Sequence, residues 1–258
     1  MKYTVYNEYN FRSIPQLQKV DISKEFEIEV LSKILPFRTN NYVINELIDW
    51  EDLENDPMFI MNFPNKQMVR KIHFERVAEL LQKKASKDAV RAYTSQVWNE
   101  MNPHPAGQMS LNVPVMDGEK LSGLQHKYRE TVLFFPSQGQ TCHAYCTFCF
   151  RWPQFIGISQ LKFLMKESSL LIKYLKENKQ VTDLLITGGD PMIMSSKHLS
   201  GYINAILDAN IPHLKNIRIG TKSLSYWPYR FVTDPDSGEI LNAFREVTKA
   251  GKQLALMT

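Results

Sequence analysis

All three cysteines of the chain lie in one short stretch, and they are the residues best suited to chemistry. Cys142, Cys146 and Cys149 have the spacing C-x3-C-x2-C. Because the chain has no other cysteine, a disulfide framework does not account for them. Three thiolates on one tight loop can hold three corners of a cubane iron–sulfur cluster and leave the fourth iron without a protein sulfur. A small chelating molecule can bind this open iron and receive an electron there.

A buried helical stripe and a zinc site are also compatible with these cysteines. Positions i, i+4 and i+7 share one helix face, so the cysteines could form part of an apolar stripe in a core. Pro136 and Gly139 upstream and Pro153 downstream leave little room for such a helix. Zinc bound by the three cysteines and by His143 or His126 is the stronger alternative. Structural zinc sites usually pair two Cys-x2-Cys turns, and the sequence has no second one.

Further motifs connect the cysteine stretch to a known family. With the aromatic Phe148 before its last cysteine, the stretch resembles the signature of the radical S-adenosylmethionine (radical SAM) enzymes, and the continuation Cys149-Phe150-Arg151 is similar to the lysine 2,3-aminomutase branch. Three more stretches resemble that branch: residues 123–128 (GLQHKY), 184–191 (LLITGGDP) and 217–221 (IRIGT). The resemblance runs from about Pro103 to the end of the chain, with a weaker likeness before it.

The resemblance implies a [4Fe–4S] cluster whose open iron is chelated by S-adenosylmethionine. Electron transfer then releases methionine and a 5′-deoxyadenosyl radical, which removes hydrogen from an unactivated substrate carbon. Phe148 is expected to pack against the adenine, with an ordinary core phenylalanine as the alternative. Gly188 and Gly189 lack a Cβ, so the backbone can approach a ligand closely. Asp190 is expected to accept a hydrogen bond from the ligand's amine, and a plain strand–helix turn is the alternative for all three residues.

The resemblance also implies the substrate, which is lysine or a related small-molecule amino acid that undergoes 2,3-amino migration. Arg151 is expected to pair with the substrate carboxylate through its planar guanidinium, with a surface arginine as the alternative. Trp152 stands where these enzymes often carry a basic residue, so the substrate pocket is expected to differ. No side chain is assigned a catalytic role. An electron donor such as flavodoxin or ferredoxin is implied, and a related enzyme that acts on lysine destined for a translation factor is left open.

The aminomutases also use pyridoxal phosphate, and the sequence leaves its use here open. The lysine that holds this cofactor corresponds to a position beyond Thr258, and none of the lysines present matches it. Where the family tends to have His-Arg-Tyr-Pro-Asp-Arg, residues 126–131 are HKYRET, so that Thr131 replaces an expected phosphate anchor. The alternatives are a radical SAM enzyme without pyridoxal phosphate, or a non-catalytic fragment that binds zinc or a cluster.

Composition narrows the class of protein. The chain has 258 residues with 43% hydrophobic content, which is ample for a core. A net charge of +4, spread along the chain, does not indicate a nucleic-acid partner. No apolar stretch approaches the ~20 residues that a membrane span needs, and the first residues have no apolar signal core. Free thiols without an export signal predict a cytoplasmic protein.

Residues 1–126 are expected to form a mainly helical N-terminal region that packs against the catalytic part, with self-association into a homo-oligomer left open. Helices are predicted from about residue 22 to Pro36, over 69–84 and over 87–101, the last ended by residues 102–105. Residues 42–50 form a short apolar segment, and the acidic run 51–57 fits either a helix start or a solvated turn.

Residues 127–258 are expected to form the radical SAM core, because strand and helix patterns alternate there. Strands are predicted at residues 132–135, 181–187, 216–221 and 252–257, and helices at 159–177, 196–208 and 240–250. The apolar run 132–135 is typical of a strand covered on both faces. In a parallel sheet, ligands gather at the carboxyl ends of the strands, where the cysteine loop, the Gly-Gly turn and Thr221 are expected.

The expected fold is therefore α/β, a partial parallel (β/α) barrel of the radical SAM type with about four of about six strands present. An unpaired edge on a buried parallel strand is costly and prone to association. We accordingly expect either that the sequence is a fragment of a longer protein, which we favour, or that another chain covers this edge.

Overall fold

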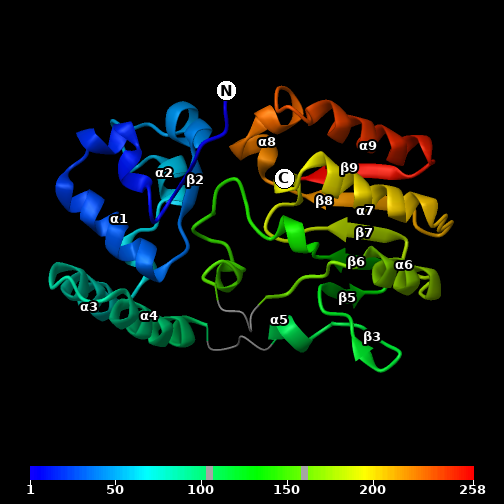
Figure 1. Cartoon of the computed structure of the whole chain (residues 1–258), viewed down its shortest axis with the longest axis horizontal. Helices are drawn as coiled ribbons and strands as arrows, with labels where there is room; N and C mark the ends of the chain where they lie inside the picture. Colours follow the sequence, from blue (N-terminus) through cyan, green and yellow to red (C-terminus); the bar gives the residue numbers. More distant parts are fainter. Residues whose placement is uncertain (103–106, 158–161) are drawn as a thin grey trace. The chain divides into compact units, whose positions relative to one another are not determined.

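The structure is a computed structural model that describes residues 1–102, 107–157 and 162–258 (Figure 1). The chain forms two compact units. The sheet unit consists of residues 105–142 and 160–258, and the helical unit consists of residues 2–104 and 143–159. The domain boundary expected after residue 126 stays a prediction; that residue lies inside the strand β5 (Leu124–Tyr128).

The sheet unit is built on a five-stranded sheet in the order β5, β6, β7, β8, β9. The four strands after β5 are β6 (Thr131–Phe134), β7 (Asp183–Ile186), β8 (Asn216–Gly220) and β9 (Gln253–Met257). Strands β6 to β9 are parallel, whereas β5 pairs antiparallel with β6. The predicted α/β class with a mainly parallel sheet is confirmed, and the interpretation of this sheet as part of a barrel stays a prediction.

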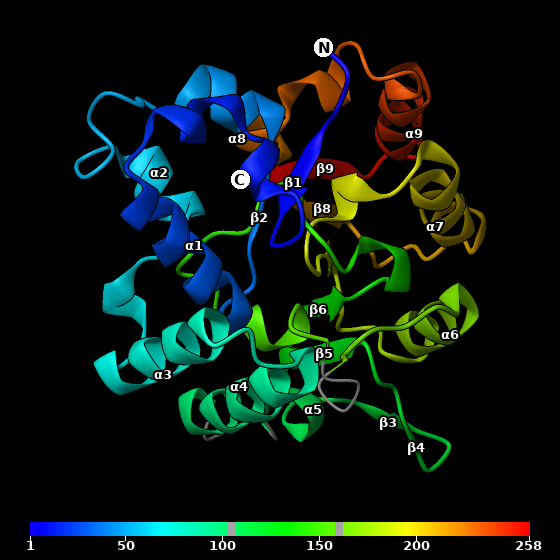
Figure 2. The same ribbon diagram turned by 60° about the vertical axis from the view of Figure 1, so that its left-hand side comes forward.

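Three helices lie side by side along one face of this sheet (Figures 1 and 2). They are α6 (Ser168–Glu177), α7 (Ser196–Asp208) and α9 (Ser237–Lys249). Every second residue of the parallel strands joins the apolar core on that face, as period-two alternation requires. Each parallel strand contributes two residues, which are Val132, Phe134, Leu184, Ile186, Ile217, Ile219, Leu254 and Leu256.

The opposite face of the sheet carries a charged pair. Arg218 Nε donates to Asp183 Oδ1 at 2.8 Å, and Thr131 Oγ1 donates to Asp183 Oδ2 at 2.9 Å. The two faces of the sheet therefore differ in polarity. Within β6, Val132 and Phe134 are buried and Leu133, on the opposite face, is half-buried. The expectation that the run 132–135 is covered on both faces stays a prediction. A continuous apolar run such as residues 132–135 does not report what the neighbouring strands place beside it.

Smaller elements complete the sheet unit. They are α5 (Gly107–Ser110), α8 (Ser223–Tyr226) and the hairpin of β3 (Val115–Met116) and β4 (Glu119–Lys120). The helix expected over residues 159–177 is wrong in its first half: α6 begins at Ser168, and Met165 lies in an extended segment that bridges Pro136. Residues 158–161 of that prediction lie outside the described residues. Phe163 and Met165 are buried although they lie outside any helix.

The described part of the helical unit contains two short strands and the α-helices α1 to α4. The strands β1 (Val5–Asn7) and β2 (Arg38–Asn40) pair antiparallel, and the helices are α1 (Ile22–Ile34), α2 (Pro57–Asn62), α3 (Lys71–Gln82) and α4 (Lys87–Met101). Side chains of α1, α3 and α4 share one apolar core. Residues 103–105, expected to end α4, lie outside the described residues. The apolar segment 42–50 contains a π-helical turn (Val43–Leu47), and the acidic run ends in Asp56, which caps α2 by accepting from Phe59 N at 2.5 Å.

Candidate functional site

The loop that leads into Cys142 starts at the carboxyl end of β6 and is held by the turn that follows β7. Gly189 N donates to Gly139 O at 3.0 Å, and Asp190 N donates to Thr141 O at 2.7 Å. The register Phe134–Ile186 places the ends of both strands at the same edge of the sheet. The structure therefore brings the Gly-Gly-Asp turn against the residue that precedes Cys142, as the parallel topology led us to expect.

The two glycines of this turn are explained by that contact. A Cβ on Gly189 would lie 2.4 Å from Thr141 O, and one on Gly188 would lie 2.9 Å from Gly139 O. Both distances are shorter than a carbon can approach a backbone oxygen. The absent Cβ atoms thus let residues 139–141, which lead into Cys142, pack on the turn, and their expected role in approaching a ligand stays a prediction.

Asp190 is buried at 2% exposure, and its carboxylate already has four donors. Oδ1 accepts from Met192 N at 2.9 Å and from Thr221 Oγ1 at 2.7 Å. Oδ2 accepts from Lys222 N at 2.9 Å and from Ser223 Oγ at 3.2 Å. A carboxylate offers about four acceptor sites, so these bonds fill its capacity. Asp190 therefore ties the turn after β7 to the segment after β8, and its expected bond to the amine of S-adenosylmethionine stays a prediction.

The electrostatics at Asp190 reflect this burial. Desolvation raises the pKa of the Asp190 carboxyl group, and the bonds from Thr221, Met192, Lys222 and Ser223 lower the same pKa in part. The sequence motifs do not single out Ser223. It follows a strand that carries a family-like motif, and the rule that functional residues gather at the carboxyl ends of parallel strands could have indicated it.

None of the three cysteines forms a disulfide, and each is half-buried. Burial raises the pKa of the Cys149 thiol, so a metal that bound there would have to displace the thiol proton. Three soft sulfur donors on one continuous loop, none used in a disulfide, fit an iron–sulfur cluster by their chemistry. Across residues 1–102, 107–157 and 162–258, no three His, Cys, Asp or Glu side chains are already gathered as a metal-binding group.

After Cys142 the loop is held by residues of the helical unit. Tyr145 N donates to Arg38 O at 2.8 Å, and Thr147 N donates to Met61 O at 2.8 Å. These two amides lie on either side of Cys146. The backbone at the central cysteine is therefore fixed by N-terminal residues, which the sequence did not indicate.

The aromatic residues of the loop are exposed, whereas its arginine is buried. Phe148 is 66% exposed and Phe150 is 76% exposed. The alternative of an ordinary core phenylalanine at position 148 is therefore wrong, and packing against an adenine stays a prediction. Arg151 is 8% exposed, so the alternative of a surface arginine is wrong as well. Its expected pairing with a substrate carboxylate stays a prediction.

Of the two histidines considered as zinc ligands, His126 uses both ring nitrogens in hydrogen bonds to other residues. Its Nδ1 lies within hydrogen-bond distance of the Tyr174 hydroxyl, and its Nε2 lies 3.2 Å from Arg129 O. With both ring nitrogens engaged inside the sheet unit, His126 has none left for a metal. The His143 ring is buried and lies edge-on to the Tyr3 ring, with centroids 5.5 Å apart.

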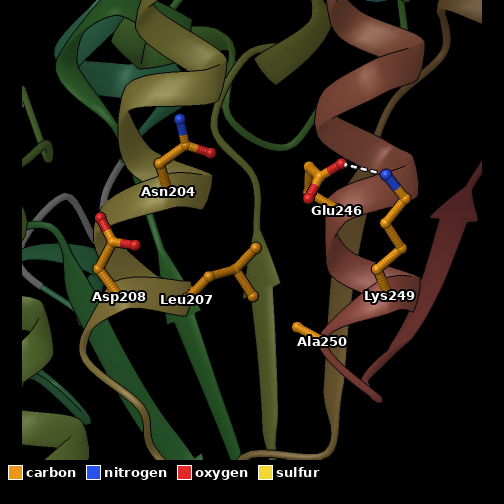
Figure 3. Close-up of a pocket in the computed structure, with 6 residues that line it drawn as sticks. All are labelled: Asn204, Leu207, Asp208, Glu246, Lys249 and Ala250. Atoms are coloured by element: carbon orange, nitrogen blue, oxygen red, sulfur yellow. Dashed lines mark hydrogen bonds and ion pairs between the residues drawn. The ribbon is translucent and has the colours of Figure 1, made fainter.

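A shallow groove of about 370 Å³ between α7 and α9 lies apart from these residues (Figure 3). Its lining residues are Asn204, Leu207, Asp208, Glu246, Lys249 and Ala250. Lys249 Nζ pairs with Glu246 Oε1 at 2.8 Å within the groove. The lining lies at the carboxyl ends of two helices that precede β8 and β9, and hence at the amino ends of those strands. This groove gathers no donor set comparable with the cysteine loop.

The fold and the site together define a chain of the α/β class whose mainly parallel sheet carries a three-cysteine loop at the carboxyl end of a strand. No protein-family model matches the chain. A protein of Aquifex aeolicus (strain VF5) named "Putative L-lysine 2,3-aminomutase" is 28% identical over 241 residues, which are 93% of this chain and 52% of that protein.

Two shorter matches are to proteins named L-lysine 2,3-aminomutase. L-lysine 2,3-aminomutase of Bacillus subtilis (strain 168) is 34% identical over 112 residues, 43% of this chain and 22% of that protein. L-lysine 2,3-aminomutase of Acetoanaerobium sticklandii is 32% identical over 119 residues, 46% of this chain and 28% of that protein. The chain is lysine 2,3-aminomutase-like, which confirms the resemblance drawn from its motifs. The matches span about half of the Aquifex protein and about a quarter of the other two.

No helix in the parts of the chain that the structure describes has both the length and the hydropathy of a membrane span.

Proposed function

We propose that the chain is a radical SAM enzyme of the aminomutase type, which binds a [4Fe–4S] cluster through Cys142, Cys146 and Cys149. S-adenosylmethionine is the proposed ligand of the open iron, and lysine or a related amino acid is the proposed substrate for 2,3-amino migration. The observation that carries this proposal is the stretch with three thiols, whose lead-in residues 139–141 pack on the Gly-Gly-Asp turn, in a chain similar to proteins named L-lysine 2,3-aminomutase.

The residues of the chain have distinct parts in this function. Bound cluster and S-adenosylmethionine supply the electron transfer and the 5′-deoxyadenosyl radical that such enzymes use. Cys142, Cys146 and Cys149 bind the metal as thiolates. Gly188 and Gly189 leave room for residues 139–141 to pack on the turn, and Phe148 offers an exposed ring for stacking on a base. Arg151 supplies a buried guanidinium of the kind that pairs with carboxylates.

Pyridoxal phosphate is not part of the proposal for this chain. Thr131, which stands at the place of an expected phosphate anchor, donates to Asp183 at 2.9 Å. It begins β6 and therefore lies at the amino end of that strand, away from the edge where the cysteine loop starts. The chain would act through the metal centre and S-adenosylmethionine on an amino-acid substrate, with an external electron donor.

The test is anaerobic reconstitution with iron and sulfide, followed by reduction with dithionite in the presence of S-adenosylmethionine. We expect 5′-deoxyadenosine and methionine in equal amounts, and we expect the Cys146→Ser variant to release neither. A reconstituted protein that carries a full cluster but releases no 5′-deoxyadenosine would overturn the radical chemistry and leave only cluster binding.

A further inference from the structure

The backbone of the cysteine loop is held by side chains from the far N-terminus as well as by backbone carbonyls. His143 O accepts from the Tyr3 hydroxyl at 3.1 Å and from Asn40 Nδ2 at 3.2 Å. Thr147 Oγ1 donates to Ile60 O at 3.0 Å. These contacts join residues separated by 140, 103 and 87 positions in the sequence, so they are features of the folded helical unit and not of a local turn.

Asn40 connects the cysteine loop to the π-helical turn Val43–Leu47. It is fully buried, and its Oδ1 accepts from Tyr42 N at 2.9 Å and from Val43 N at 3.2 Å, at the start of the π-helical turn. One side-chain amide therefore satisfies two backbone donors and also donates to the loop. Losing the bonds at Oδ1 or the bond from Nδ2 would leave a buried polar group without a partner. The Asn40 side chain is therefore held in one orientation.

Hydrogen bonds hold the backbone on both sides of Cys146. The amides of Tyr145 and Thr147 are bonded to Arg38 O and Met61 O. Together with the bonds at His143 O and Thr147 Oγ1, these contacts fix the peptides on both sides of Cys146 in position and direction. The Tyr145 ring also stacks on Phe155 with centroids 4.5 Å apart, which restrains the loop further.

We infer that Tyr3, Asn40 and Thr147 are positioning residues for the metal centre, and that the first 62 residues are part of the cluster-binding apparatus. They act by holding residues 143–147 in the conformation that presents the Cys146 thiol, without binding iron themselves. This inference rests on the proposed function for the identity of the cluster. The hydrogen bonds that hold residues 143–147 can be measured by amide hydrogen exchange without any metal.

The test uses variants that remove only the hydroxyl groups of Tyr3 and Thr147. Tyr3→Phe keeps the ring beside His143, and Thr147→Val is nearly isosteric. We expect the double variant to exchange the amide hydrogens of Tyr145 and Thr147 about tenfold faster than the unmodified chain, measured by mass spectrometry on the metal-free, reduced protein. After anaerobic reconstitution we expect it to retain about half of the iron and sulfide or less.

Two further variants control for general destabilisation. Tyr93→Phe removes a hydroxyl that lies 3.0 Å from His73 Nδ1 between α3 and α4 of the same unit, and it should leave the exchange of the loop and the iron content unchanged. Thr147→Ser keeps the hydroxyl group. The double variant Tyr3→Phe/Thr147→Ser should therefore exchange these amide hydrogens at the same rate as the single variant Tyr3→Phe. If the double variant fails to fold, the two single variants are compared in the same way.

The outcomes separate this inference from the proposed function. Unchanged amide exchange together with full iron in the double variant would overturn the positioning roles and leave the proposed function intact. Suppose that the double variant exchanges the amide hydrogens of Tyr145 and Thr147 faster, but the unmodified chain takes up no iron–sulfur cluster. This result would support the positioning of residues 143–147 and overturn the proposed function.

Discussion

At the scale of single residues, Gly189 is the position where one added carbon should disturb the site. A Cβ there would lie 2.4 Å from Thr141 O and 2.6 Å from Thr141 N, both in the backbone of the loop before Cys142. We expect Gly189→Ala to lower the free energy of unfolding by about 1–3 kcal/mol, as overpacking does, and to weaken cluster retention. Urea unfolding and iron analysis measure the two effects.

Gly201 provides the matched control for that substitution. It lies within α7, and an added Cβ meets no atom within 4 Å. We expect Gly201→Ala to raise the free energy of unfolding by about 0.4–1 kcal/mol, because alanine restricts the unfolded chain without strain in the helix. Equal behaviour of the two variants would contradict the close packing of turn and loop.

Asp190 distinguishes a structural role from a direct ligand role. Four donors converge on its carboxylate, and a side-chain amide in its place would turn N–H hydrogens towards donors that need an acceptor. We therefore expect Asp190→Asn to lower the free energy of unfolding by about 1–3 kcal/mol, measured by urea unfolding at pH 7. A variant as stable as the unmodified protein that has lost only S-adenosylmethionine binding would instead favour the direct contact with the ligand amine.

At the scale of elements, the packing of α7 and α9 depends on a buried arginine. Arg230 is 5% exposed and donates to Met192 O and Met194 O, both at 2.7 Å, and to Asp236. Asp236 in turn accepts from Ser196 N at 2.7 Å at the start of α7. The bond from Arg230 is the main cause that lowers the pKa of Asp236 from 3.8 to about 2.

The sign of the resulting pH dependence follows from that lowered pKa. The folded state favours the charged carboxylate, so its stabilising contribution is present above about pH 3.8 and is lost as the pH falls towards about 2. We expect Asp236→Asn to be less stable than the unmodified chain at pH 5–6, and the difference to shrink below pH 3.8. Denaturant titrations across this range measure it, and a constant difference down to pH 2 would contradict the assignment.

Sequence patterns predict some elements closely and miss others for physical reasons. The helix predicted over 87–101 is α4, and the one over 196–208 is α7, because an apolar stripe marks each of them. The stretch before Ser168 does not form the predicted helix, because its buried residues pack from an extended segment. Gly123, with φ of +95° and no room for a Cβ beside Leu164 and Met165, is part of that packing and carries no periodic signal.

At the scale of the whole molecule, one part of the candidate site could be predicted and one could not. Alternating strands and helices imply a parallel sheet, and this rule alone places the loop before Cys142 beside the Gly-Gly-Asp turn. The support of residues 143–147 depends on contacts such as Tyr3 to His143 and Arg38 to Tyr145, which form between distant residues and partly through backbone carbonyls. Backbone acceptors have no sequence signature, so only the folded chain reveals them.

The central claim is that three thiols of one loop hold an iron–sulfur cluster, and metal analysis after anaerobic reconstitution tests it most directly. We predict about four iron and four sulfide atoms per chain, a brown protein, and a paramagnetic signal on reduction. Cys146→Ser should lose most of this iron, whereas Gly201→Ala should retain it. A colourless protein that binds zinc in place of iron, or a Cys146→Ser variant that keeps its full iron content, would contradict the claim.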